Sequence, residues 1–329
     1  MQITVKKAVI DGVLHSDVLL DTTTHEILGN TRTPEYDFFV PTFVDIHCHG
    51  GGGFYFSDPN IENIRIAIDT HKRSGTKQLL TSLVTDTLDN LKNQIARLIP
   101  FYERGEIAGI HLEGPYLSHH RCGAHEPTLL RLPNLDEIKS LLDVGNGAIA
   151  MVTIAPELPG AIEVIKYLEK NRIIAAIGHT DGDANDAAAA IDAGASVVTH
   201  FTNAMSKLSD GENSFAQRVL DDPRINLELI VDGVHVPLAQ VAEIFEKAPN
   251  RIILISDAMS AAGNPDGDYK IGSLDVEVRQ SVARLKSNGA LAGSTLTLTR
   301  AAENAMRVGV PKVLVDHATT SAPIAMLLD

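Results

Sequence analysis

The sequence predicts an α/β protein built as a (β/α)8 TIM-type barrel, with a small N-terminal β subdomain beside it. From Pro41 onward, apolar strand-like runs alternate with amphipathic or alanine-rich segments that are typical of helices. Eight such runs occur over roughly 250 residues, which is the usual size of this barrel. The chain has 329 residues, enough to bury a core of that size.

The predicted elements follow one another in a regular order. Residues 1–40 alternate apolar and polar positions between turn residues, and we expect short strands there that form a small β subdomain. The barrel is expected over residues 41–329, with strands at 43–47, 78–84, 107–111, 148–154, 173–177, 196–200, 227–231 and 251–255. Helices are expected at 61–74, 88–102, 133–142, 161–171, 183–193 and 238–247. A doubly wound sheet is disfavoured because no GxGxxG or Walker motif follows any strand.

Composition excludes several classes of partner. The formal net charge is −14 and there is no Lys/Arg run, so a nucleic acid or an anionic membrane surface is not expected as a partner. No apolar run approaches the ~18 residues of a spanning helix. Two cysteines, Cys48 and Cys122, cannot form a disulfide framework, so a cytoplasmic location is expected. The 13 histidines are the feature that needs an explanation.

Ligand-type side chains stand at the ends of the predicted strands. The carboxyl ends of parallel barrel strands open onto one face, where catalytic groups gather. One mouth is therefore expected to hold His47, His49, Glu113, His179, His200 and Asp257. Residues 47 and 49 share a side of their strand because side chains alternate with period two. The glycine run at 50–53 predicts backbone that passes close to bound atoms.

Imidazole and carboxylate together are the ligand set of a borderline divalent ion, usually zinc, with iron, cobalt and manganese as alternatives. Such an ion lowers the pKa of bound water towards ~7 and polarises a carbonyl group. Asp257 is placed to take the proton of that water and return it to a leaving amine. His111 is expected to pack lower in the barrel, and His119 and His120 are left unassigned in a polar loop. Solvated positions are expected for His15, His25, His71 and His317.

The motifs around these residues resemble those of the N-acetylglucosamine-6-phosphate deacetylase family of the amidohydrolase superfamily. The resemblance covers about residues 38 to 325 and rests on HCHG at 47–50, HLEGPYL at 111–117, RCGAHEP at 121–127, IGHT at 177–180, THFTNAM at 199–205, VDGVHV at 231–236, SDAMSAAG at 256–263 and LAGSTLTL at 291–298. It implies hydrolysis of N-acetyl-D-glucosamine 6-phosphate to D-glucosamine 6-phosphate and acetate in amino-sugar catabolism, by a homodimer.

Roles follow from the resemblance position by position. Glu113, His179 and His200 match the family's metal ligands, and Asp257 matches the catalytic acid and base. Because His47 and His49 are both present, one or two ions are expected, with Glu113 bridging them. Substrate contacts are implied for Ala124, His125, Asn203, Ala204, His235, Leu291, Ala292 and Gly293, with His235 and the amides at 203–204 suited to phosphate.

Two departures from the family pattern stand out. A phosphate-contacting arginine usually follows the NAM motif, but the matching position here is Gly211. Lys207, Arg218 and Arg121 are the candidates to replace it. Family members also usually continue with strands that complete a small β-sandwich, whereas this sequence stops at Asp329. Two expectations follow: residues 1–40 form a reduced sheet that lacks those C-terminal strands, or the native chain continues past Asp329.

Other functions remain as alternatives. The missing arginine keeps open the same chemistry on N-acetylgalactosamine 6-phosphate or on an unphosphorylated N-acetyl sugar. A ring amidohydrolase or deaminase is disfavoured, since no lysine for a carbamylated bridge stands at the fourth strand's end, where Ile154-Ala155-Pro156 occurs. A non-catalytic sugar-phosphate-binding protein would be expected to lack a ligand or the acid/base, and both are present.

Overall fold

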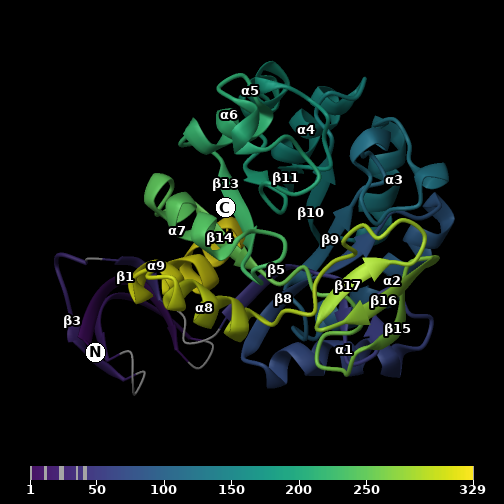
Figure 1. The fold of residues 1–329 in the computed structure, drawn as a ribbon. Coiled ribbons are helices and arrows are strands. Elements are labelled where there is room, and N and C mark those ends of the chain that lie inside the picture. The colour runs from purple at the N-terminus through teal and green to yellow at the C-terminus, as the bar shows by residue number, and fades with distance from the viewer. Residues whose placement is uncertain (1, 11–12, 22–25, 35, 40–42, 329) are drawn as a thin grey trace.

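A parallel barrel with helices around it forms most of the molecule (Figure 1), in a computed structural model that describes residues 2–10, 13–21, 26–34, 36–39 and 43–328. Its strands are hydrogen-bonded in the order β14-β13-β12-β11-β10-β9-β8-β5. They are β5 (Phe43–Cys48), β8 (Thr76–Val84), β9 (Gly109–Glu113), β10 (Ile149–Ile154), β11 (Ile174–Ile177), β12 (Val197–Val198), β13 (Asn226–Ile230) and β14 (Ile252–Ile255). The predicted fold class is confirmed.

Backbone bonds close the barrel between its first and last strands. Beyond the end of β14, the Asp257 amide donates to His47 O (2.9 Å) and the His49 amide donates to Ala258 O (2.9 Å). The Asp45 carboxylate accepts bonds from the amides of His47 and Ser256, each at 3.3 Å. This closure fixes Asp257 beside His47 and His49, at the end of β5.

Helices cover the outside of the barrel, and each of the six predicted helices is present. They are α1 (Ile61–Arg73), α2 (Leu88–Glu103), α3 (Leu135–Gly145), α4 (Ala161–Lys170), α5 (Ala184–Asp192), α6 (Phe215–Asp221), α7 (Leu238–Lys247), α8 (Leu298–Arg307), α9 (Lys312–Asp316) and α10 (Ala322–Leu328). In α1, Asn60 caps the start by accepting from the Glu62 amide (3.0 Å), and Ile64 and Ile68 are buried on one face. None of the described helices is long and apolar enough to cross a bilayer.

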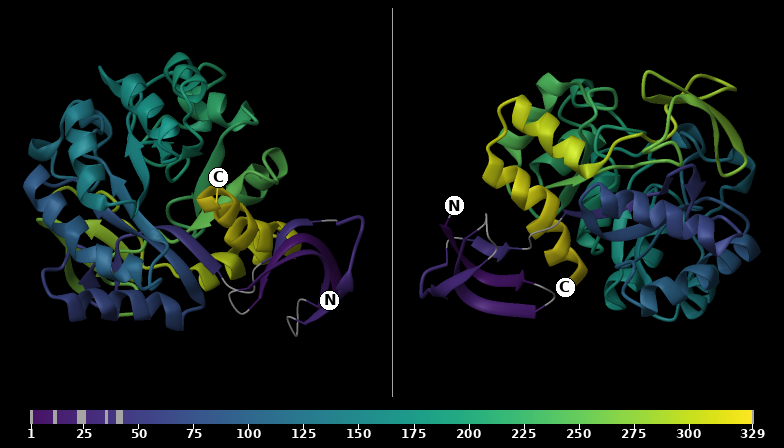
Figure 2. Two further views of the ribbon diagram at one scale, coloured as in Figure 1. Left: turned by 180° about the vertical axis from the view of Figure 1, so that it is seen from behind. Right: turned by 90° about the horizontal axis from the view of Figure 1, so that it is seen from below.

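The N-terminal residues form a separate four-stranded sheet in the order β3-β2-β1-β4. Its strands are β1 (Gln2–Ile10), β2 (Val13–Asp21), β3 (Ile27–Asn30) and β4 (Tyr36–Phe39). A small apolar cluster holds it together, formed by Val5, Ala8, Val18 and Leu20. Figure 2 shows this sheet outside the barrel, beside the C-terminal helices. His25 lies outside the described residues.

An antiparallel sheet inserted after β14 was not predicted from the sequence. It consists of β15 (Gly267–Ile271), β16 (Leu274–Arg279) and β17 (Val282–Leu285). The alternation of buried and exposed residues along β16 and β17 is the period-two signal that could have predicted it. This sheet and the segment after it bring Ile271 and Leu291 to the mouth of the barrel.

Candidate metal centre and active site

The carboxyl ends of the barrel strands surround a cavity of about 340 Å³. The predicted site residues that line it are His49, Glu113, Ala124, His125, His179, His200, Asn203, Ala204, His235, Asp257, Leu291 and Gly293. His47 lies just beneath, fully buried. Ala292 does not line the cavity, because it packs in the apolar cluster of β15–β17 and donates its amide to Ala283 O (3.2 Å). The substrate contact predicted for Ala292 is therefore not supported.

Glu113, His179 and His200 form a first cluster of metal-ligand type. Oε1 of Glu113 lies 3.2 Å from His179 Nε2 and 3.1 Å from His200 Nε2, and the two Nε2 atoms are 2.9 Å apart. Nδ1 of His179 donates to Arg121 O (2.7 Å), which leaves the lone pair of the neutral ring on Nε2. These three donor atoms, held at one point by different strands, suit a divalent ion.

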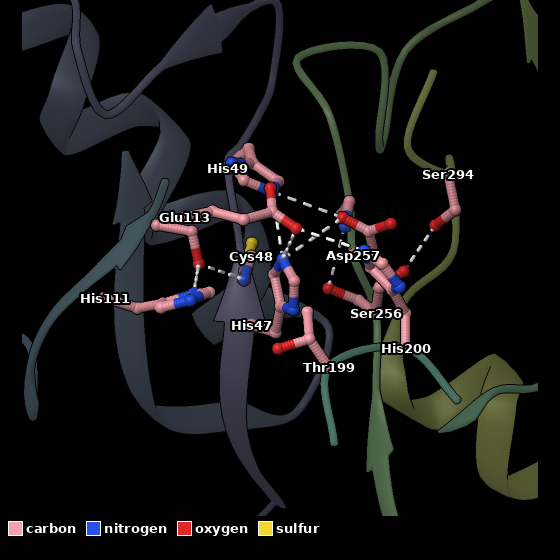
Figure 3. A network of polar contacts seen from close by, with 12 residues as sticks. His47, Cys48, His49, His111, Glu113, Thr199, His200, Ser256, Asp257 and Ser294 are labelled. Carbon is pink, nitrogen blue, oxygen red and sulfur yellow. Dashed lines mark hydrogen bonds and ion pairs between the residues drawn. The ribbon is translucent and has the colours of Figure 1, made fainter. Parts of the chain in front are cut away.

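A second cluster shares Glu113 with the first and adds His47 of β5 and His49, which follows that strand. His49 Nε2 lies 3.2 Å from Oε2 of Glu113, and His47 Nε2 lies 3.4 Å from its Oε1. The Nε2 atoms of His47 and His49 are 3.1 Å apart. Figure 3 shows Glu113 between these rings and His200. The carboxylate is therefore placed to bridge two ion positions.

Glu228 on β13 is a buried residue of the site that was not predicted from the sequence. Its Oε2 lies 2.9 Å from His47 Nδ1 and accepts a bond from the His200 amide at 3.1 Å. It thus orients a histidine of the second cluster and the backbone of the first, as carboxylates behind metal-bound histidines do. The one sequence signal for it was a single acidic residue inside the apolar run at 227–231.

The contacts of Glu228 lead to a first prediction. Glu228→Gln keeps the shape of the side chain but removes the charge behind His47, so we expect metal affinity to fall by ~10- to 100-fold. A metal titration against a chromophoric chelator measures this. Glu277→Gln, on strand β16 of the inserted sheet and away from the cavity lining, is the matched control. Wild-type affinity in a folded Glu228→Gln protein would show that Glu228 does not support the site.

Asp257 faces both His47 and His49 (Figure 3). Its Oδ1 lies 3.2 Å from His49 Nε2 and 3.5 Å from His47 Nε2. Burial alone would raise the pKa of Asp257, but His47 and His49 outweigh burial and lower that pKa to about 2. Burial likewise lowers the pKa of His49, whereas Asp257 and Glu113 raise it to about 9. The carboxylates therefore create a position that attracts positive charge, and Asp257 is ionised at neutral pH.

The backbone is strained where these residues stand. His179, His200 and Asp257 have φ values of 47°, 31° and 47°, in a region that non-glycine residues seldom occupy. Strain of this kind persists where the surrounding structure enforces it, and it concentrates at functional sites. Each of the three lies two residues beyond the end of a barrel strand (β11, β12 and β14) and lines the cavity.

His125 adds a neutral donor above Glu113. Its Nδ1 accepts from the Thr85 amide (3.3 Å), so the ring hydrogen is on Nε2, which lies 3.2 Å from Glu113 Oε2. Burial lowers the pKa of His125 to about 4, an effect that Glu113 only partly offsets. The ring is therefore an uncharged N–H donor inside the cavity.

The other side of the cavity carries the groups expected to contact phosphate. His235 donates Nδ1 to Asp232 Oδ2 (2.7 Å), which leaves its Nε2 free of that bond. The Asn203 amide donates to His200 O (2.9 Å), and its side-chain nitrogen donates to main-chain carbonyls. The Asn203 amide, predicted to bind phosphate, is thus already used in a hydrogen bond within the protein. Ala204, at φ 50°, lines the cavity.

The remaining histidines agree only in part with the predictions. His111 packs as predicted, bound to Ser82 Oγ (2.9 Å) and Thr153 Oγ1 (2.8 Å). His71 was expected to be solvated, but it is fully buried on the face of α1 turned to the barrel, where Nε2 lies 2.8 Å from Gly50 O. His120 was left unassigned and lines the cavity.

The glycine run at 50–53 packs against other parts of the protein, and two of its members pack against α1. A Cβ added at Gly51 would lie 2.9 Å from His71 Nε2, and one added at Gly52, where φ is 63°, would lie 2.5 Å from Thr70 Oγ1. None of the four glycines lines the cavity. Gly50 lies against the backbone of Phe54, and Gly53 lies against Asn264. The expected proximity of the run to bound atoms is therefore wrong, because protein atoms are the close neighbours of all four glycines.

A parallel barrel whose strand ends hold histidine and carboxylate clusters beside an ionised aspartate defines a metal-dependent hydrolase. The chain belongs to the amidohydrolase family, which matches residues 38–323. Members of this family depend on metal ions, in keeping with the two clusters.

Similar proteins within this family indicate which kind of hydrolase the chain resembles. The N-acetylgalactosamine-6-phosphate deacetylase of Escherichia coli O157:H7 is 34% identical over 297 residues, covering 88% of this chain and 78% of the relative. The N-acetylglucosamine-6-phosphate deacetylase of Bacillus subtilis (strain 168) is 35% identical over 281 residues, covering 83% and 71%. A solved structure from Mycobacterium smegmatis, an aspartate-to-alanine variant of that deacetylase in complex with N-acetyl-D-glucosamine 6-phosphate, superposes with a TM-score of 0.86 at 36% identity, covering 99% of this chain and 90% of that one.

Proposed function

We propose that this protein is a metal-dependent deacetylase that hydrolyses N-acetyl-D-glucosamine 6-phosphate to D-glucosamine 6-phosphate and acetate, in amino-sugar catabolism. The observation that carries the proposal is the position of Asp257, with Oδ1 3.2 Å from His49 and beside the Glu113 carboxylate that both clusters share. The similar proteins named above are deacetylases of amino-sugar 6-phosphates.

The residues of the cavity divide the reaction between them. Glu113, His179 and His200 would hold a divalent ion, which supplies water activation and carbonyl polarisation when bound. Asp257, ionised at neutral pH, accepts a proton from the attacking water and passes it to the departing amine. The Nε2–H of His125 is placed to donate to the acetyl oxygen as negative charge develops there.

We propose zinc as the metal, with a second and weaker ion at His47 and His49. If so, replacing both residues with alanine lowers the metal content of the purified protein from two equivalents towards one, as measured by elemental analysis. His119→Ala, in an exposed 3-10 turn, is the control. One equivalent in the wild type, unchanged in the double variant, would remove the second site.

Acetate release from four sugars tests the substrate assignment. N-acetylglucosamine and N-acetylgalactosamine are compared, each with and without the 6-phosphate. We expect N-acetylglucosamine 6-phosphate to have the highest kcat/KM. Preference for the galactosamine phosphate is the second candidate function, favoured by the Escherichia coli relative. Equal rates with and without phosphate would overturn the assignment to a sugar phosphate.

We propose a cytoplasmic homodimer. The thiols of Cys48 and Cys122 are free, which is compatible with a reducing compartment. The N-terminal sheet is proposed to be a small subdomain of its own, over residues 1–40, because its apolar cluster is separate from that of the barrel, proposed over 41–329. Size-exclusion chromatography with light scattering tests the dimer.

A further inference from the structure

The cavity contains very little permanent positive charge. Among the described residues that line it, Arg121 is the single arginine, and lysine does not occur. The chain as a whole has a net charge of −14, and the cavity itself contains the carboxylates of Glu113 and Asp257. A dianionic substrate therefore needs a local cation, and the structure limits where that cation can come from.

The main chain holds Arg121 firmly beside the metal centre. It ends the 3-10 turn His119–Arg121, and its amide donates to Ser118 O at 3.1 Å. Its carbonyl accepts the bond from His179 Nδ1 at 2.7 Å. The position of the arginine is thus tied to a residue of the first cluster, and its side chain extends from a fixed point.

The side chain of Arg121 lies on the β11–β12 side of the mouth. Its Nε donates to Asp181 Oδ1 at 2.9 Å. The preceding residue, Thr180, donates its amide to Ala204 O at 3.0 Å, so the loop that carries Asp181 adjoins the loop that carries Ala204. Asp257 follows β14 instead. Arg121 therefore lies on the side of the cavity where Ala204 is expected to contact phosphate, and not on the side of the acid/base Asp257.

Asp181 orients the guanidinium of Arg121 but leaves its Nη atoms available to another ligand. The contact uses Nε, and the side chains of Arg121 and Asp181 are 40% and 45% exposed. An ion pair this exposed is screened by solvent and contributes little, so it does not prevent a second partner from binding. The Nη atoms of a guanidinium present parallel N–H groups that match two oxygens of a phosphate.

The other two candidate cations lie elsewhere. Lys207 is exposed and does not line the cavity. Arg218 is bound to Asp222 beside α6, with Nη2 3.0 Å from Oδ2, and it is also absent from the cavity lining. Gly211, the position at which the family resemblance leads one to expect an arginine, is a glycine and has no side chain to offer.

We propose that Arg121 selects phosphorylated substrates by binding the 6-phosphate, together with His235 Nε2 and the Ala204 amide. This inference rests on the proposed function in taking the substrate to be an amino-sugar phosphate. It assigns to this chain a phosphate contact on the loop after β9, within the same subunit, in place of an arginine after the NAM motif.

The test compares Arg121→Met with Lys207→Met as the matched control, using metal-loaded protein. For Arg121→Met, kcat/KM on N-acetylglucosamine 6-phosphate is expected to fall ~10- to 100-fold, mainly through KM, because a charge-assisted contact is lost. Its kcat/KM on unphosphorylated N-acetylglucosamine and its metal content are expected to stay within about twofold of wild type, since the Arg121 carbonyl is retained. Arg121→Lys should recover part of the loss, and Lys207→Met should match the wild type.

Calorimetric binding of glucose 6-phosphate against glucose separates this inference from the proposed function. If the wild type hydrolyses neither sugar, the proposed function fails, yet loss of glucose 6-phosphate binding in Arg121→Met still supports the arginine contact. An unchanged KM and unchanged glucose 6-phosphate binding in Arg121→Met would overturn the inference and leave the function standing. Equal losses on both sugars, or a loss confined to Lys207→Met, would also overturn it.

Discussion

Asp257→Asn is expected to lower kcat for acetate release by ~10²- to 10⁴-fold while leaving the metal content unchanged. Asparagine has the same shape but cannot accept a proton from water or return it to the amine. Asp257 lies outside both ligand clusters, although its Oδ1 is 3.2 Å from His49. The loss should therefore fall on turnover rather than on the assembly of the site.

The comparison needs a control and a metal measurement. Asp136→Asn, at a side chain that is 95% exposed on α3, should retain wild-type kcat. Elemental analysis of both variants shows whether the ions are retained. Near-normal turnover in Asp257→Asn would refute the acid/base role, and loss of metal in that variant would mean that Asp257 serves as a ligand.

Glu113→Gln is expected to have the other large effect. Glu113 belongs to both clusters and contacts His47, His49, His179 and His200. Burial would raise its pKa, but His47 and the hydrogen bonds of neighbouring histidines outweigh burial and hold that pKa well below its usual range. An amide cannot bridge two cations with the same charge, so metal content should fall at both positions.

Turnover of Glu113→Gln should fall by at least ~10³-fold, since a catalytic ion supplies several kcal/mol and each 1.4 kcal/mol is tenfold in rate. Parallel measurements of bound metal and acetate release check this result. Glu243→Gln, exposed on α7, is the matched variant. Full metal occupancy and activity in Glu113→Gln would rule out the bridging role.

Much of the barrel and of the metal centre could be predicted from sequence because both follow from local patterns. Buried parallel strands have apolar runs, and the topology places the residues that follow them at one mouth. These two facts are enough to predict that Glu113, His179, His200 and Asp257 lie together. The ends of individual strands are predicted less well than the strands themselves. A strand was expected at 196–200, but the structure has only Val197–Val198.

Other features depended on contacts between distant segments. In the sequence, Glu228 is one acidic residue in an apolar strand, and only its contacts with His47 and His200 reveal its place behind the clusters. His71 was expected to be solvated because the pattern of α1 does not say which neighbour its buried face meets. Arg121 could not be separated from Lys207, since the course of the loop after β9 decides which of them reaches the cavity.

The central claim is that a divalent ion held by Glu113, His179 and His200 enables this protein to deacetylate an amino-sugar phosphate. Acetate release from N-acetylglucosamine 6-phosphate by zinc-loaded protein, by protein treated with a chelator, and by treated protein given zinc again tests it most directly. Release should be rapid at first, fall at least ~10³-fold without the ion, and return with zinc. Equal release without the ion, or none from fully loaded protein, would contradict the claim.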